Sequence, residues 1–245
     1  MVARGGLQQG LRGVRLLTAE PELAEDLTGD DVEAATQALV APMVELQPGG
    51  ERMLEAEPDT ARGLLGLLVL DGMLLREVEL PGTSHAELIG ESDLILPGGV
   101  DSGGGSTIMW RVISPARIAI LDRQFVARAQ AWPQVLLRLT VRALRRSHDL
   151  AWQSAIRNQT RVDQRIHRLL WHYADRWGRV TRDGVTLELP LTHESMGKLV
   201  GAHRPSVTSA IGMLERRGLL NRPSHGTWLL TRAAPAEATP LRRSA

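Results

Sequence analysis

The stretch LTHESMGKLVGAHRPSVTSAIGMLERRGLL, residues 191–220, decides the fold of the C-terminal part of the chain. Thr192 can cap a first helix, and Gly201 can end it, because glycine tolerates the positive φ of a helix C-terminus. A second helix can begin near Arg204, since Pro205 is acceptable in a first turn, where the amide has no intrahelical partner. The stretch therefore predicts two short helices joined by a tight turn.

Apolar side chains recur at helical spacing in both segments, which predicts one buried face on each helix. They are Met196, Leu199 and Val200 in the first helix and Val207, Ala210, Ile211 and Leu214 in the second. The opposite face of the second helix carries Arg204, Ser206, Thr208 and Ser209. This is the layout of a helix-turn-helix that reads DNA. The pattern alone also fits an amphipathic helical hairpin without a DNA role.

A two-stranded wing is expected after the second helix. Gly218 can end that helix, and the turn-rich segment NRPSHG, residues 221–226, follows it. The segment lies between the apolar pairs Leu219–Leu220 and Leu229–Leu230, which fit two short strands. A wing next to a helix-turn-helix favours the DNA-binding interpretation over the plain helical hairpin.

The net charge of +1 hides an asymmetry along the chain. Residues 1–120 contain 8 Arg and Lys against 19 Asp and Glu. Residues 121–160 contain 7 against 2, and residues 161–232 contain 12 against 6. A basic C-terminal half is expected to meet a polyanion, and an acidic N-terminal half is expected to face away from it.

Composition excludes several classes of protein. A chain of 245 residues has room for two modest domains, and its lack of cysteine excludes disulfides and cysteine-ligated zinc or iron–sulfur clusters. It has no apolar run of 18 residues, and its N-terminus lacks a hydrophobic signal core. The seven histidines show no metal-ligand spacing. We therefore expect a soluble cytoplasmic protein without a cofactor or a metal.

The N-terminal half reads as a leader followed by a sheet. Residues 1–30 are expected to form a partly ordered leader that contains one short helix. The sensor domain is expected to span residues 31–121, with a short helix at 30–39. From Val40 to about Leu121, short apolar runs alternate with Gly- and Pro-containing turns, which favours a small antiparallel roll or barrel. Asp71-Gly72 lies between two apolar runs and is expected to form a hairpin turn.

Residues 122–158 predict one long helix with two apolar stripes. One stripe is Leu137, Val141, Leu144, Ala151 and Ala155, and a neighbouring one is Leu136, Leu139, Ala143 and Leu150. We expect one stripe to pack on its own domain and the other on a partner, which makes this a dimerisation helix. The alternative is a single long core helix. Four arginines are expected on the remaining faces: Arg138, Arg142, Arg145 and Arg146.

The C-terminal domain is expected to span residues 159–232. A helix from about Arg161 to Trp177 would turn Ile166, Leu169, Leu170 and Tyr173 inward, and residues 185–189 fit a short strand. Residues 233–245 have few bulky apolar groups and are expected to be a disordered tail.

The order of an acidic β-roll, a long helix and a winged helix-turn-helix resembles the Crp/Fnr superfamily of bacterial transcription regulators. The most specific part is VGAHRPSVTSAIGMLERRGLL, residues 200–220, which looks like the family's recognition helix. The resemblance implies an α+β fold, with a jelly-roll-like cyclic-nucleotide-binding domain ahead of the long helix. It also implies a homodimer that binds palindromic sites, with an effector in the roll shifting the DNA-binding heads.

The resemblance assigns DNA contacts by position. Arg204 matches a family arginine that contacts guanine, and a guanidinium can donate twice to guanine O6 and N7. Thr208 and Ser209 join it as candidate base-reading residues. Ser209 and Pro205 stand where some members have a base-reading arginine and glutamate, so the target sequence should differ. The candidate phosphate contacts are Thr192, His203 and Ser206, which would position the protein without reading sequence.

The effector site of the family is degenerate in this sequence. Gly90-Glu91 fits a Gly-Glu pair, but Ser106-Thr107 stands where cyclic-nucleotide-binding members have Arg-Ser or Arg-Thr, so the arginine that neutralises the cyclic phosphate is absent. Leu150 and Ala151 occupy helix positions that offer hydroxyls to the base in some members. A cyclic phosphate buried without a cation lacks its main charge compensation. We therefore expect no tight binding of cyclic AMP.

The sequence thus favours a homodimeric, sequence-specific DNA-binding regulator. Its expected partners are double-stranded DNA and a second copy, with RNA polymerase as a further candidate, an effector of unknown identity and no membrane. The main alternative is a ligand- or protein-binding sensor or scaffold with a vestigial helix-turn-helix. An enzyme is the third class, which the lack of a nucleophile–base pair or a metal constellation disfavours.

Overall fold

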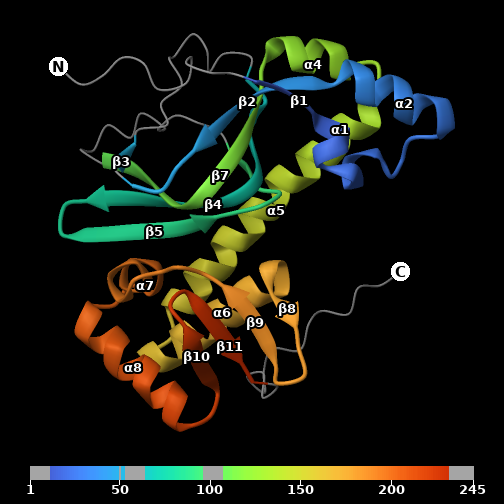
Figure 1. Ribbon diagram of the computed structural model, residues 1–245. Helices are drawn as coiled ribbons and strands as arrows, with labels where there is room; N and C mark the ends of the chain where they lie inside the picture. Colours follow the sequence, from blue (N-terminus) through green and yellow to red (C-terminus); the bar gives the residue numbers. More distant parts are fainter. Residues whose placement is uncertain (1–11, 50, 53–63, 96–106, 232–245) are drawn as a thin grey trace. The chain divides into compact units, whose positions relative to one another are not determined.

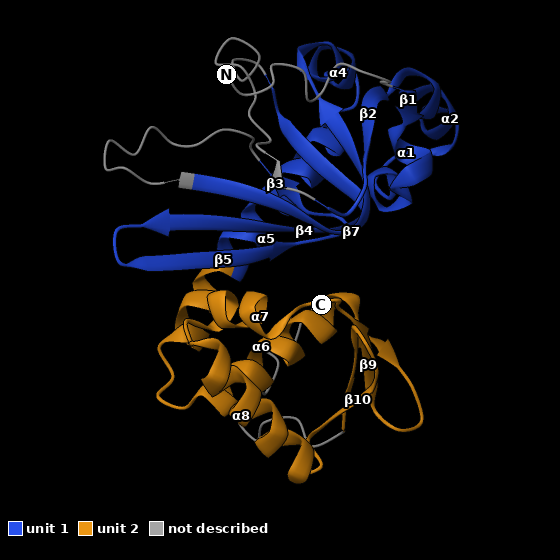
Figure 2. Ribbon diagram, turned by 60° about the vertical axis from the view of Figure 1, so that its left-hand side comes forward, with its two compact units in different colours: residues 1–149 blue, residues 150–245 orange. Residues whose placement is uncertain are grey.

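The computed structural model describes residues 12–49, 51–52, 64–95 and 107–231. It divides into two compact units, residues 1–149 and residues 150–245 (Figure 2). Helix α5 (Pro133–Arg157) runs across the division. Within the described ranges, no helix is long and apolar enough to cross a membrane.

An antiparallel sheet forms the body of the first unit (Figure 1). Its described strands are β1 (Arg12–Arg15), β2 (Val40–Leu46), β3 (Glu51–Arg52), β4 (Gly66–Leu80), β5 (Thr83–Ile89), β6 (Leu94–Ile95) and β7 (Thr107–Leu121). They follow the order β1-β2-β7-β4-β5, with β3 paired to β7 and β6 paired to β4. The antiparallel roll predicted from alternating apolar runs and turns is confirmed.

Short helices cover one part of this sheet. They are α1 (Leu16–Ala19), the 3-10 helix η1 (Pro21–Ala24), α2 (Gly29–Ala38) and α4 (Arg123–Ala129). Leu16, Leu39, Phe125 and Leu139 share one buried apolar cluster with residues of the sheet. This cluster ties the start of α5 to the roll, because Leu139 lies two turns inside that helix.

Residues 12–30 are part of the folded unit, so the expectation of a partly ordered segment is wrong there, whereas the expected short helix is present as α1. Strand β1 pairs with β2, and Leu16, Leu17 and Leu23 are fully buried. The Gly- and Arg-rich composition suggested a loose segment, but the leucines within it join the buried apolar cluster of the unit. Residues 1–11 and the predicted tail at 233–245 lie outside the described residues.

The Asp71-Gly72 pair forms a β-bulge rather than the expected hairpin turn. Strand β4 runs straight through it, and its pairing with β7 shifts register at this point. Gly72 has a φ of +81°, and a Cβ there would lie 2.1 Å from the carbonyl oxygen of Pro115. The Asp71 carboxylate accepts the backbone N–H of Arg117 at 3.1 Å. The hairpin turn between β4 and β5 lies at Gly82, where φ is +80°.

The helix expected over residues 122–158 is two helices. Asp122 caps α4, because its Oδ1 accepts the N–H of Phe125 at 2.8 Å. A short turn then separates α4 from α5, which begins at Pro133. Proline suits a first helical position and cannot continue a helix that is already running, so Pro133 fixes where the second helix starts.

Three arginines of α5 face the roll, contrary to the expectation that they lie off the packed faces. Arg138, Arg142 and Arg146 follow one another at four-residue spacing and reach carboxylates of the first unit. The pairs are Arg138 with Glu25 and Asp26, Arg142 with Glu20 and Glu22, and Arg146 with Glu87 and Asp93. Glu20, Glu87 and Asp93 are buried and need cations within reach, which explains why the arginine-bearing face of α5 packs against them.

A compact winged helical fold makes up the second unit. Beyond the end of α5 it contains α6 (Val162–Trp177), β8 (Arg179–Val180), β9 (Val185–Glu188), α7 (His193–Val200), α8 (Arg204–Arg216), β10 (Leu220–Ser224) and β11 (Thr227–Leu230). The strands form an antiparallel sheet in the order β10-β11-β9-β8. Helix α6 packs against α7, α8 and β9. Its predicted inward residues, Ile166, Leu169, Leu170 and Tyr173, are all buried.

The wing is the hairpin of β10 and β11. Its turn is shorter than the six residues expected, because the first four of them belong to β10 and only His225 and Gly226 form the turn. Trp228 on β11 is buried, and its indole N–H donates to the carbonyl oxygen of Leu189 at 2.8 Å. The base of the wing is thereby fixed to the segment that leads into α7.

Candidate nucleic-acid interface

Helix α7 is held at both ends by the residues predicted for that purpose. The Thr192 hydroxyl accepts the N–H of Ser195 at 3.0 Å, and Gly201 ends the helix in the left-handed region with φ +64°. Arg165 on α6 donates to the carbonyl oxygens of Val200 at 3.2 Å and Gly201 at 3.0 Å. A cation at these unpaired carbonyls stabilises the helix end, so the turn into α8 has a fixed geometry.

Helix α8 begins at Arg204 and has the two faces that the sequence predicts. The apolar residues of the pattern are all buried: Val207, Ala210, Ile211 and Leu214. The residues of the opposite face are all exposed: Arg204, Pro205, Ser206, Thr208 and Ser209. Apart from Arg204, the side chains on the exposed face are small, which allows the helix to approach a groove of DNA closely.

The candidate base-reading residues lie together in the first turn and a half of α8. Arg204 and Ser209 are exposed on this helix. Thr208 lies one turn after Arg204, and its hydroxyl donates to the Arg204 carbonyl oxygen at 3.1 Å. Because that hydroxyl hydrogen is engaged, Thr208 can offer a base its methyl group or an oxygen lone pair.

The candidate phosphate-contacting residues come from two places. Thr192 caps α7, and His203 and Ser206 lie at the start of α8; all three are exposed. The Thr192 hydroxyl already accepts the Ser195 amide, which leaves its own hydrogen for a further acceptor or for the Ser195 hydroxyl at 3.1 Å. The assignment of these three residues to phosphate contacts stays a prediction.

His193 and Arg222 belong to this surface, and sequence reasoning missed them. The His193 ring lies between the wing and α8, with Nε2 2.9 Å from Nη1 of Arg222 and Nδ1 2.9 Å from the hydroxyl of Thr208. The Arg222 guanidinium also stacks over the ring of Trp228, 4.9 Å from its centroid. These side chains come from α7, α8, β10 and β11, so no local pattern in the sequence could bring them together.

The far end of α8 is anchored to α6 by a carboxylate. Asp163 is buried and accepts two hydrogen bonds from Arg161, at 3.0 Å each, and one from Arg217 at 3.4 Å. Burial opposes ionisation of this carboxyl, but the hydrogen bonds and charge of Arg161 lower its pKa below the ordinary value. Asp163 is therefore charged at neutral pH and holds the residue that follows α8.

Comparison with known proteins agrees with this geometry. Residues 164–234 match the family model of the Crp-like helix-turn-helix domain. No curated protein sequence matches the chain. Residues 164–234 therefore form a Crp-like helix-turn-helix domain. The resemblance inferred from residues 200–220 is thereby confirmed.

Solved structures share the Crp/Fnr fold over most of the chain. A CooA variant from Carboxydothermus hydrogenoformans is 16% identical, with 94% of this chain and 93% of that chain covered and a TM-score of 0.60. FixK2 from Bradyrhizobium japonicum is 19% identical, with 78% and 93% covered and a TM-score of 0.56. A CRP-family transcriptional regulator from Thermus thermophilus is 21% identical, with 77% and 91% covered and a TM-score of 0.56. At these identities the similarity establishes the fold alone.

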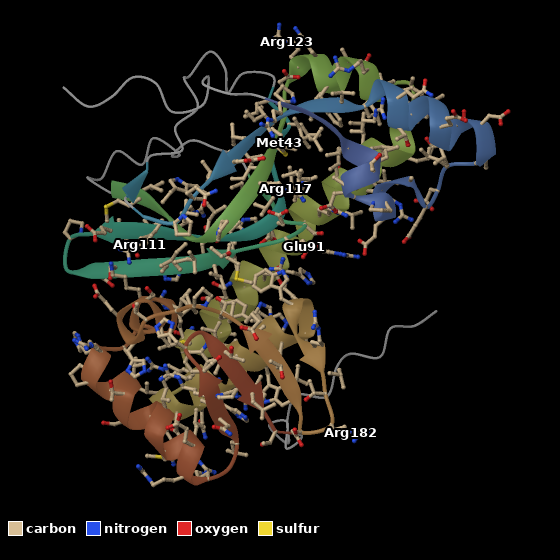
Figure 3. All side chains as sticks on the ribbon, viewed as in Figure 1. Met43, Glu91, Arg111, Arg117, Arg123 and Arg182 are labelled. Carbon is tan, nitrogen blue, oxygen red and sulfur yellow. The ribbon has the colours of Figure 1, made fainter. Side chains whose placement is uncertain are left out.

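The residues predicted to form a degenerate effector site are only partly within the described structure. Gly90 and Glu91 follow β5, where the Gly90 N–H donates to Asp93 at 2.9 Å and Glu91 is exposed (Figure 3). Ser106 lies outside the described residues, and the side chain of Thr107 is also outside them. Leu150 is half-buried and Ala151 is exposed on α5.

The turn that carries Glu91 is tied into the arginine face of α5. The Ser92 hydroxyl donates to Glu20 at 3.3 Å, and Glu20 also pairs with Arg142 at 2.6 Å. Arg146 contacts Glu87 at 2.6 Å and lies 3.8 Å from Asp93 of the same turn. Arg142 and Arg146, the arginines of α5 near this turn, are therefore already paired with carboxylates of the protein.

Proposed function

We propose that the protein is a homodimeric, sequence-specific DNA-binding regulator of transcription, whose α8 enters the major groove of a palindromic site. The observation that carries the proposal is the two-faced α8, with a buried apolar face and an exposed face that begins with Arg204. The helix-turn-helix is followed by a two-stranded wing. In a two-fold dimer the second copy of α8 would meet the next half-site about 34 Å away.

An exposed apolar stripe on α5 supports the dimer. Leu137, Val141 and Leu144 are 63%, 40% and 62% exposed and recur along one face of the helix. Trp152, further along the same helix, is 55% exposed. The opposite face carries the buried Leu139 and Arg142, so the stripe points away from the described part of the roll. A second copy of α5 is the natural partner for a self-complementary apolar stripe.

Control by cyclic AMP is not part of the proposal. The sequence lacks the family's phosphate-binding arginine, since Ser106 occupies that position. The arginines that α5 places against the roll are already paired with Glu20 and Glu87, as the pairs at 2.6 Å indicate. A cyclic phosphate would have to break one of these buried pairs to gain a counter-charge, which leaves a carboxylate unpaired.

Cyclic AMP is therefore expected not to bind the protein tightly. Isothermal titration calorimetry on the full chain should detect no binding with a dissociation constant on the order of micromolar or below. A micromolar or tighter constant would contradict the assignment of the roll as a degenerate site. Cyclic GMP serves as a second probe, because it carries the same cyclic phosphate on a different base.

Replacing Arg204 with alanine is expected to relax base discrimination at one position of each half-site. A bidentate guanidinium–guanine contact contributes about 1–3 kcal/mol, which corresponds to about 5- to 150-fold in relative affinity. Competition binding with single-base variants of a selected site measures the effect. Phosphate contacts elsewhere should keep the affinity for unrelated DNA nearly constant.

Arg182→Ala is the matched control for Arg204→Ala. Arg182 is exposed in the turn between β8 and β9, away from α8 within the second unit, and its loss removes the same charge (Figure 3). It is expected to leave base discrimination unchanged. If Arg204→Ala and Arg182→Ala behaved alike, the role assigned to Arg204 would be wrong.

A sensor or scaffold with a vestigial helix-turn-helix is the remaining alternative. It predicts that the exposed face of α8 has no affinity for DNA, whereas the proposal predicts salt-sensitive binding even to random duplex. Filter binding of the full chain to random duplex DNA separates the two. The enzyme alternative has no supporting constellation among the residues singled out from the sequence.

A further inference from the structure

A continuous chain of hydrogen bonds joins the wing to the first turn of α8. It begins at Arg222 on β10, passes through both nitrogens of His193 and the hydroxyl of Thr208, and ends at the backbone carbonyl of Arg204. The three contacts measure 2.9, 2.9 and 3.1 Å. The chain ends on the backbone of the residue that begins the base-reading face.

The donors in this chain of hydrogen bonds determine the tautomer and the protonation state of His193. Arginine can only donate, so Nε2 of His193 must accept from Arg222 and carries no hydrogen. The hydrogen therefore sits on Nδ1 and is donated to Thr208, whose own hydroxyl hydrogen goes to the Arg204 carbonyl. The chain is complete only with a neutral His193 in this tautomer.

The Arg222 end of the chain is itself held in place. Its guanidinium lies over the Trp228 ring, and Trp228 is buried with its indole N–H bonded to the Leu189 carbonyl. A guanidinium stacked on a buried ring has little freedom to follow a displaced imidazole. The position of the wing is thus transmitted to α8 through rigid groups on both sides of His193.

We propose that His193 is a positioning residue that locks the wing and the base-reading turn of α8 into one geometry, and so sets the sequence selectivity of the protein. The proposal rests on the proposed DNA-binding function and deepens it. His193 acts through Thr208 and Arg204 and need not touch a base. Selectivity depends on the placement of the guanidinium fork, because a bidentate contact tolerates little displacement.

Protonation of His193 would break the chain at Arg222. The charged groups that face the ring are Arg222 on β10 and Arg204 and Glu215 on α8. Burial lowers the pKa of His193, the charges of Arg222 and Arg204 lower it further, and Glu215 opposes them. The neutral form therefore persists at neutral pH, and the chain is lost as the pH falls through this lowered pKa.

Protonation of His193 is expected to affect affinity for random DNA and selectivity for the specific site differently. Added positive charge strengthens attraction to any DNA backbone, so affinity for random duplex should rise or hold as the pH falls. Selectivity for the specific site over random duplex should fall once the pH drops below about 6.5, the ordinary pKa of histidine, because the pKa of His193 is lower than that value. The ratio of the two affinities isolates the positioning role from the general charge effect.

The experiment compares the full-length wild type with His193→Ala and His193→Gln, using a selected site and random duplex as competitors. His193→Ala should lower the selectivity ratio by about 2- to 10-fold, the range expected for one lost hydrogen bond. Glutamine offers one acceptor and one donor and does not titrate, so His193→Gln should keep the ratio and lose its pH dependence. His225→Gln, at the exposed turn of the wing, is the matched control and should keep that dependence.

The tautomer of His193 is a second measurement that needs no variant. Nitrogen NMR of the DNA-free protein should show the hydrogen on Nδ1 at neutral pH. The Nε2–H tautomer, or a wild-type selectivity ratio equal to that of a folded His193→Ala, would overturn the proposal. A wild type that binds all DNA weakly and without dependence on salt would instead overturn the proposed function beneath it.

Discussion

Replacing Leu144 with glutamate is expected to convert the protein from a dimer into a monomer and to weaken its binding to a palindromic site. Leu144 is 62% exposed at the middle of the apolar stripe of α5. In a two-fold interface each copy would place its carboxylate near that of the other copy, in a dehydrated seam. A monomer binds each half-site independently. Its affinity for the palindrome should therefore be about 10²- to 10⁴-fold lower than that of a dimer, which binds both half-sites at once.

Sedimentation equilibrium measures the first effect, and titration of a labelled palindrome measures the second. Ala143→Glu is the matched control, because Ala143 is exposed on a different face of the same helix and the added charge is the same. The control should remain a dimer and keep the wild-type affinity. A Leu144→Glu protein that stayed dimeric would show that the copies associate through another surface.

Replacing Arg142 with methionine is expected to lower the free energy of unfolding of the first unit by about 3–5 kcal/mol. Arg142 and its partner Glu20 are 8% and 5% exposed, and their closest atoms lie 2.6 Å apart. Without the guanidinium, the Glu20 carboxylate would keep one neutral hydrogen-bond donor, the Ser92 hydroxyl at 3.3 Å. Urea unfolding followed by circular dichroism measures the difference.

The Arg142 effect has a predicted dependence on pH. Burial already raises the pKa of Glu20, and Arg142 opposes that rise. Removing Arg142 raises this pKa further, so Glu20 can become neutral in the folded variant as the pH falls. The difference in unfolding free energy between variant and wild type should therefore be largest near neutral pH and shrink toward about pH 4.

Two further variants distinguish the effect of breaking a buried ion pair from the effect of removing a positive charge. Arg138→Met removes an arginine whose carboxylate partners, Glu25 and Asp26, are largely exposed, and should lower the free energy of unfolding much less than Arg142→Met does. The double variant Glu20→Gln with Arg142→Met should cost less than Arg142→Met alone, because no buried charge is left unpaired. Equal costs for Arg138→Met and Arg142→Met would contradict the account.

The helix-turn-helix could be predicted because its signals are local. A cap at Thr192, a glycine at the end of α7 and a proline at the start of α8 each depend on neighbours within a few residues. The alternation of buried and exposed positions along α8 follows from helix geometry alone. The apolar runs of the roll likewise predicted an antiparallel sheet, which the structure confirms.

The predictions for Asp71-Gly72 and for the arginines of α5 were wrong because each local sequence pattern is compatible with two structures. Asp-Gly favours positive φ, which serves a β-bulge in β4 as well as a hairpin turn, and the close approach of Pro115 to Gly72 is a tertiary contact. The arginines of α5 look like a solvated face in sequence. Their burial depends on carboxylates that are more than 50 residues away, such as Glu87 for Arg146 and Glu20 for Arg142.

The least predictable part of the candidate site is the hydrogen-bond chain through His193. Its members are separated by 15 residues between His193 and Thr208 and by 29 between His193 and Arg222. A histidine at the start of a helix has many structural uses, so the sequence offers no reason to single it out. Only the packing of the wing against α7 and α8 reveals what it joins.

Selection of bound sequences from a random pool of duplex DNA, followed by a salt titration on the enriched site, tests the central claim most directly. The account predicts enrichment of a palindrome whose half-sites lie about one helical turn apart, with an affinity that falls steeply as salt rises. It also predicts that Arg204→Ala loses preference at one base of each half-site. Failure to enrich any sequence, together with binding that ignores salt, would contradict the claim that this protein reads DNA.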